Sequence, residues 1–125
     1  IYTYSKPLKM DYKTILQKIQ NDTHFIQWME DRFDKKASHL CNKMIESNEL
    51  RNEQEVLIRE CLEAGGEKKL SGDGIYSDPY ALFQYSNQEI YWVTCDYEII
   101  EGYFNNITNA ENTYYECLED EHCND

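Results

Sequence analysis

The chain has 125 residues and a formal net charge of −12, and this length allows one domain with a hydrophobic core. No stretch approaches the roughly 20 apolar residues that a membrane-spanning helix needs. Because phosphate groups are bound mainly by Lys and Arg, we expect neither nucleic acid nor an anionic membrane as a partner.

The charge is divided unevenly along the chain. Residues 1–69 hold 12 basic and 12 acidic side chains, whereas residues 70–125 hold 12 acidic side chains and no basic ones. Eight of the 11 tyrosines also lie in the second half. Such a surface favours a basic protein as a partner. An acidic surface that serves only solubility is the alternative.

Five cysteines are present and none forms a C-x-x-C pair: Cys41, Cys61, Cys95, Cys117 and Cys123. Widely spaced cysteines predict a disulfide framework and secretion into an oxidising compartment. Sequons at Asn21 and Asn106 agree with secretion. A bridge from Cys41 to Cys61 across a helical hairpin is one option, but the odd number leaves one thiol over and the connectivity open.

Hydrophobic periodicity predicts two helices before residue 45. The first is short, with Leu8, Tyr12, Ile15 and Ile19 on one face at steps of four, three and four. The second begins after a cap at Asp22 or Thr23 and keeps one apolar face for about five turns. That face consists of Phe25, Met29, Phe33, Ala37, Leu40 and Met44.

A third helix is predicted from about Asn52 to Ala64, with Val56, Leu57 and Cys61 facing inward. Gly65 and Gly66 should end it, because glycine commonly follows the last turn of a helix. Residues 67–77 are predicted to form an exposed loop.

The second half is also predicted to be helical. Asp78 and Pro79 resemble a helix start, with Asp as the cap and Pro in the first turn. Residues 88–104 are apolar nearly all round, which predicts a central buried helix, although the segment IYWVT at 90–94 is also typical of a strand over residues 90–95. A last helix should cover residues 111–120. The expected fold is therefore all-α: a single compact, disulfide-stapled, monomeric domain of about five to six helices.

Few patterns in the chain indicate chemistry. Cys117, His122 and Cys123 could contribute to a zinc site, but the paired ligand spacing of structural zinc sites is missing. No metalloprotease, nucleophile-elbow or phosphate-loop motif is present. We therefore expect no enzymatic activity, no metal and no cofactor.

Tyrosines beside acids are the main candidates for binding, in the segments CDYEIIEGYF and NTYYECLED. Tyrosine supplies a large contact area at low entropic cost and is enriched at interface hot spots, although aromatic residues of a small domain more commonly lie in its core. The candidate binding residues are Glu98, Glu101, Tyr114, Tyr115, Glu119, Asp120 and Glu121.

Four segments carry a resemblance to a known family. They are the long helix around Cys41, LIRECLEAGG around Cys61, WVTCDYEIIEGYF around Cys95, and the ending YYECLEDEHCND. Together they resemble the C-terminal domain of the mosquito thirty-kilodalton salivary antigen family. The resemblance implies a protein secreted in saliva that binds collagen, a host extracellular protein, and inhibits platelet adhesion and aggregation.

The chain begins at Ile1, so we expect a processed or excised piece, and the resemblance implies that it is the C-terminal part of a longer secreted protein. A salivary inhibitor of complement or coagulation is an alternative function. A second is an odorant-binding-like carrier of small molecules. The cysteine pair separated by three residues that such carriers usually show is missing, which argues against this carrier.

Overall fold

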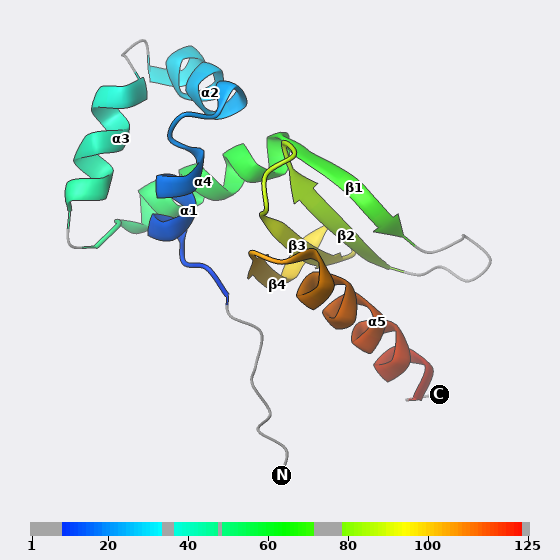
Figure 1. The fold of residues 1–125 in the computed structure, drawn as a ribbon. Helices are drawn as coiled ribbons and strands as arrows, with labels where there is room; N and C mark the ends of the chain where they lie inside the picture. The colour runs from blue at the N-terminus through cyan, green and yellow to red at the C-terminus, as the bar shows by residue number, and fades with distance from the viewer. Residues whose placement is uncertain (1–8, 34–36, 48, 72–78, 124–125) are drawn as a thin grey trace. The chain divides into compact units, whose positions relative to one another are not determined.

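The computed structural model describes residues 9–33, 37–47, 49–71 and 79–123, without the side chains of residues 37, 38 and 120–123. Contacts divide the chain into two compact units. We call residues Asp11–Gly66 the helical unit, and residues Glu67–Asp125 with Ile1–Met10 the sheet unit. Figure 1 shows the elements of both units. That the whole chain behaves as one domain stays a prediction.

The helical unit contains α1 (Tyr12–Ile19), α2 (Thr23–Phe33), α3 (Ala37–Glu46) and α4 (Asn52–Ala64). Helix α1 contacts α3 and α4, and α2 contacts α3. Of the apolar faces predicted for the first two helices, Ile15, Ile19, Phe25, Met29 and Met44 are buried, whereas Phe33 is exposed. The buried core of the unit consists of Ile15, Leu16, Ile19, Phe25, Met29, Cys41, Met44, Ile58, Cys61 and Leu62.

Caps set the ends of these helices. A carboxylate oxygen of Asp11 accepts a hydrogen bond from the Thr14 amide at 2.8 Å, and Asp22 does the same for the Phe25 amide at 3.2 Å. The Gly65 amide donates to the Cys61 carbonyl and closes α4. The predicted bounds of α4 and the cap at Asp22 are therefore confirmed.

Two details of the helical prediction differ, and one is not tested. The predicted second helix is two helices, of which α2 ends at Phe33 and α3 begins at Ala37. Helix α4 buries Ile58, Cys61 and Leu62 and leaves Val56 exposed, because its inward face is centred one residue further along than predicted. Leu8 lies outside the described residues.

The sheet unit is built on strands β1 (Gly66–Ser71), β2 (Tyr80–Tyr85), β3 (Tyr91–Cys95) and β4 (Glu98–Phe104), followed by α5 (Ile107–Cys123). The strand order is β1-β2-β3-β4, with antiparallel pairing of β2 with β3 and of β3 with β4. Helix α5 contacts β2, β3 and β4 along one face of the sheet (Figure 1).

The two faces of the sheet hold different groups of side chains. On the face towards α5, Leu82, Tyr91, Val93 and Phe104 pack with Ala110 and Tyr114 of the helix. On the other face the ring of Trp92 stacks on Phe83 and meets Tyr103 edge-on, with centroids 5.8 and 5.7 Å apart. Strand β3 is buried on both faces, and β4 buries Tyr103 and Phe104 at its end, which explains much of the apolar character of residues 88–104.

The prediction of an all-α domain is wrong, because the chain folds as a mixture of five helices and a four-stranded sheet among the described residues. Residues 88–104 form the β3–β4 hairpin, so the strand alternative for residues 90–95 is confirmed. The helix predicted after Pro79 is strand β2, and part of the predicted loop at residues 67–77 is strand β1; Asp78 lies outside the described residues. Helix α5 begins at Ile107, four residues before the prediction, because Asn106 accepts hydrogen bonds from the amides of Thr108 and Asn109.

The disulfide staple is also corrected. No disulfide joins Cys41, Cys61, Cys95 or Cys117, the four cysteines whose side chains the structure describes. The proposed bridge from Cys41 to Cys61 is absent, and the thiol of Cys61 faces His24 of α2 instead. The side chain of Cys123 lies outside the described residues.

Candidate functional site

The turn between β3 and β4 presents an exposed tyrosine between two acids. Cys95 pairs with Glu98 across the hairpin, so the turn consists of Asp96 and Tyr97 alone. Both residues have positive φ angles, 50° and 72°, as two-residue hairpin turns of type I′ require. The side chains of Asp96 and Glu98 are exposed. We call Asp96, Tyr97 and Glu98 the acidic turn.

Tyr97 is 94 % exposed. At a positive φ, glycine or asparagine is favoured, because a side chain with a bulky Cβ meets its own backbone there. Tyr97 therefore adopts an unfavourable backbone conformation. Because its ring is exposed, burial of the ring does not offset this cost. Residues that break a local rule in this way cluster at functional positions.

Helix α5 adds a second exposed group in the sheet unit. Tyr115 is 50 % exposed, and Glu116 and Glu119 on the same helix are exposed. These three residues lie away from Ala110 and Tyr114, which face the sheet. We call Tyr115, Glu116 and Glu119 the outer face of α5.

The predicted binding residues fall into different places. Glu98 belongs to the acidic turn, and Tyr115 and Glu119 belong to the outer face of α5. Tyr114 is only 3 % exposed and lies in the core, where its ring meets Tyr115 edge-on at 5.3 Å and orients it. The side chains of Asp120 and Glu121 lie outside the described residues.

Glu101 is half-buried on β4 and forms an ion pair with Lys9. Part of its charge is compensated by that lysine, so Glu101 contributes less to the negative surface than Glu98 does. The predicted helix over residues 88–104 would have put Glu98 and Glu101 one turn apart. On the strand they are separated by an irregularity in the pairing of β3 with β4.

Tyr97 lies in the segment CDYEIIEGYF but was not among the candidate binding residues, because a helix over residues 88–104 placed it on an inward face. A signal was present in the sequence. Asp96 and Tyr97 stand between two runs rich in β-branched and aromatic residues, and Asp is favoured in hairpin turns.

The charged side chains of the sheet unit are mostly acidic. Every charged side chain in residues 70–125 is acidic. Burial raises the pKa of the Tyr91 hydroxyl, and the charges of Glu89 and Glu111 raise this pKa further. The direction is the one expected where carboxylates oppose the formation of another negative charge.

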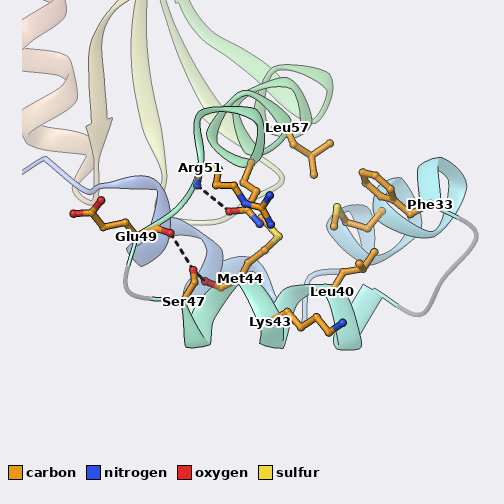
Figure 2. Close-up of a pocket in the computed structure, with 10 residues that line it drawn as sticks. Phe33, Leu40, Lys43, Met44, Ser47, Glu49, Arg51 and Leu57 are labelled. Carbon is orange, nitrogen blue, oxygen red and sulfur yellow. Dashed lines mark hydrogen bonds between the residues drawn. The ribbon is translucent and has the colours of Figure 1, made fainter.

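The helical unit contains a cavity of about 320 Å³ (Figure 2). Its apolar wall comes from α2, α3 and α4 and consists of Met29, Phe33, Leu40, Met44 and Leu57. Two cationic residues, Lys43 and Arg51, also line it. The volume lies at the small end of the range for ligand pockets in proteins.

Polar residues order one end of this cavity. The hydroxyl of Ser47 donates to the carbonyl of Met44 at 2.7 Å, and the Arg51 amide donates to the side-chain oxygen of Gln54 at 2.9 Å. Figure 2 shows both contacts, and it shows the carboxylate of Glu49 pointing away from Phe33, Leu40 and Leu57. These contacts hold the connection between α3 and α4 in place.

A thiol and an imidazole meet elsewhere in the helical unit. The sulfur of Cys61 lies 3.9 Å from Nδ1 of His24, a pairing that also occurs in thiol nucleophiles. Cys61 is fully buried, and reactive thiols are partly exposed. The pair therefore fits a packing role better than a catalytic one.

No group of three potential metal ligands occurs in the described part of the chain. Of the residues considered for zinc, Cys117 packs against the core beneath α5, and the side chains of His122 and Cys123 are not described. No helix among the described residues is long and apolar enough to cross a membrane.

Comparisons with known proteins identify no family. No protein-family model matches the chain, and no significant match is found among curated proteins or solved structures. The resemblance to the mosquito salivary antigens therefore stays a prediction.

Proposed function

We propose that this protein is a secreted, non-enzymatic binding protein that docks on a basic protein through the acidic turn and the outer face of α5. Tyr97 is the observation that carries the proposal. Its ring is almost fully exposed, at a backbone position that favours glycine or asparagine, and its neighbours in the sequence, Asp96 and Glu98, are both acids. Solubility would require the acids but not an exposed aromatic ring at this position.

The two parts of the surface have different roles in the proposed complex. The carboxylates of Asp96, Glu98, Glu116 and Glu119 attract a basic partner and speed its association. The rings of Tyr97 and Tyr115 supply contact area with few rotatable bonds. Lysine and arginine side chains of the partner would pair with the carboxylates and pack their stems on the rings.

Collagen is the partner that the resemblance suggests, and its chemistry suits the surface. It offers lysine and arginine along a rod, so acids and flat rings are suitable contacts. Masking collagen in this way would keep platelet receptors from it and inhibit platelet adhesion and aggregation. This role, secretion in saliva included, rests on the resemblance.

Replacing Tyr97 with glycine tests the proposal. The variant Tyr97→Gly creates an Asp-Gly turn, the pair that two-residue hairpins favour. We expect the free energy of unfolding to stay within about 1 kcal/mol of wild type or to rise. We expect binding to immobilised collagen to weaken about tenfold or more, as for an aromatic hot spot.

The other hairpin supplies a matched control. Asn87 is exposed and has a φ of 59° in the turn between β2 and β3, so Asn87→Gly makes the same backbone change away from the acidic turn.

Complement components and thrombin, immobilised in parallel, test the alternative partners. The comparison uses every partner that wild type binds. If Tyr97→Gly and Asn87→Gly bind each of them as tightly as wild type does, the acidic turn is ruled out as the docking surface.

A further inference from the structure

The cavity of the helical unit has the features of a binding site for an amphiphile. We propose that it binds an aliphatic carboxylate of medium chain length, with the tail against the apolar wall and the carboxylate at one of the two exposed cations of the lining, Arg51 or Lys43. This inference does not depend on the proposed protein partner, because the helical unit contains neither the acidic turn nor the outer face of α5.

The wall of the cavity suits a flexible tail. Met29 and Met44 are buried, and methionine side chains adapt to irregular ligands. Phe33, Leu40 and Leu57 add apolar surface from three different helices. The cavity volume of about 320 Å³ corresponds to about ten methylene-sized groups, at the roughly 30 Å³ that a water-sized group occupies in a liquid.

Two cations give the cavity its preference for an anionic head group. Neither Lys43 nor Arg51 forms an ion pair with any side chain in the described ranges. The one acid among the lining residues, Glu49, points its carboxylate away from Phe33, Leu40 and Leu57 (Figure 2). Both cations are exposed, so a carboxylate can reach them and keep part of its hydration while the tail leaves water.

The same charges exclude other ligands. An alcohol of equal length gains the tail contacts only, and a cationic amphiphile meets two like charges. The site therefore favours a saturated fatty acid of about ten carbons, with decanoate as the probe.

Methionine methyl groups report directly on the cavity. The chain has three methionines, of which Met29 and Met44 line the cavity and Met10 belongs to the sheet unit. In the full chain with ¹³C-labelled methionine methyls, we expect decanoate to shift the signals of Met29 and Met44 in a saturable manner. The Met10 signal should not move, and single methionine-to-leucine variants assign the three signals.

Charge and tail variants separate the two parts of the site. The double variant Lys43→Gln with Arg51→Gln should bind decanoate about tenfold more weakly and bind decanol as wild type does. Phe33→Ala should weaken the binding of both ligands. Lys18→Gln with Arg59→Gln removes two exposed charges of the same unit that do not line the cavity, and it should leave both affinities unchanged.

Three results would overturn the proposal. The first is the absence of saturable shifts at Met29 and Met44 with decanoate. The second is equal affinity of the wild type for decanoate and decanol, or an equal loss of decanoate affinity in the variant at Lys43 and Arg51 and in the variant at Lys18 and Arg59. The third is a shift of both signals when the concentration of the protein alone is raised, because a second copy of the chain would then occupy the cavity.

Discussion

Tyr97 combines three properties that rarely occur together in one residue. It is almost fully exposed, it has a positive φ angle, and acids stand on both sides of it in the sequence. A sequence selected only for a stable hairpin would place asparagine or glycine there. The departure from that rule is the reason to assign a binding role to the residue.

Gly102 shows the opposite case, a residue fixed by packing. A Cβ atom at this position would lie 2.9 Å from the Cβ of Trp92 on the neighbouring strand. Trp92 is buried between Phe83 and Tyr103 and has little room to move. We predict that Gly102→Ala lowers the free energy of unfolding by about 1–3 kcal/mol, measured by chemical denaturation.

Glu98→Ala on the same strand is the control, because an exposed side chain should change stability by less than about 0.5 kcal/mol. A Gly102→Ala variant as stable as wild type would show that β4 does not approach β3 this closely.

Asp11 gives a prediction about pH. The hydrogen bond from the Thr14 amide lowers the pKa of the Asp11 carboxyl, because the bond favours the charged form. The carboxyl therefore titrates at a lower pH in the folded chain than in the unfolded chain. Its contribution to stability is present above the unfolded pKa of about 3.9 and is lost as the pH falls through the lower folded pKa.

We predict that Asp11→Ala costs about 0.5–2 kcal/mol near pH 7, as for the loss of a helix cap. The difference from wild type should shrink below about pH 4. Asp11→Asn keeps the capping oxygen but has no charge to titrate, so its stability should not follow this part of the pH profile. Chemical denaturation at a series of pH values from about 3 to 7 gives the free energy of unfolding of wild type and both variants. A cost for Asp11→Ala that is the same at every pH would contradict a charged cap.

Among the elements, residues 88–104 show why periodicity alone misled the prediction. Ile90, Val93, Tyr97, Ile100 and Phe104 recur at helical steps, but a hairpin whose first strand is buried on both faces produces a similar apolar run. What separates the two structures is the tight turn at Asp96 and Tyr97 and the close approach at Gly102. Neither feature leaves a periodic pattern in the sequence.

Val93 and Ile100 distinguish the hairpin from a buried helix. In a central helix both residues would be buried, and a charge at either would unfold the chain. In the structure Val93 is fully buried, whereas Ile100 is 45 % exposed. We predict that Val93→Asp unfolds the chain or lowers its stability by more than about 3 kcal/mol, and that Ile100→Asp costs less than about 1 kcal/mol. Thermal unfolding followed by circular dichroism measures both, and similar large losses would favour the helix.

The helical unit was easier to predict. Asn52–Ala64 matched because Gly65 and Gly66 stop a helix by a local mechanism. The cap at Asp22 is local in the same sense. The break between α2 and α3 was missed, because the apolar face continues in register from Phe33 to Ala37.

At the scale of the whole molecule, the division of charge could be read from the sequence alone. The acids of residues 70–125 were visible there, and so was their proximity to tyrosines. Which tyrosines are exposed was not visible, because Tyr114 and Tyr115 are adjacent and only the fold buries one and exposes the other. The cavity of the helical unit was also missed, since it depends on how α2, α3 and α4 pack.

In the proposed function, the acids of the sheet unit attract a basic partner. Glu98, Glu116 and Glu119 are exposed residues of that unit, and Glu30, Glu46 and Glu63 are exposed residues of the helical unit. Changing either set to glutamine alters the net charge of the chain by the same amount. Exposed charges contribute little to stability, so both triple variants should melt close to wild type.

The most direct measurement is the association rate with immobilised collagen for wild type and both triple variants, at about 0.05 M and 0.5 M salt. We predict that the wild-type rate falls as salt rises, that the triple change at Glu98, Glu116 and Glu119 slows association, and that the triple change at Glu30, Glu46 and Glu63 has a smaller effect. Equal effects of the two triple changes, or an association rate that does not depend on salt, would contradict the claim.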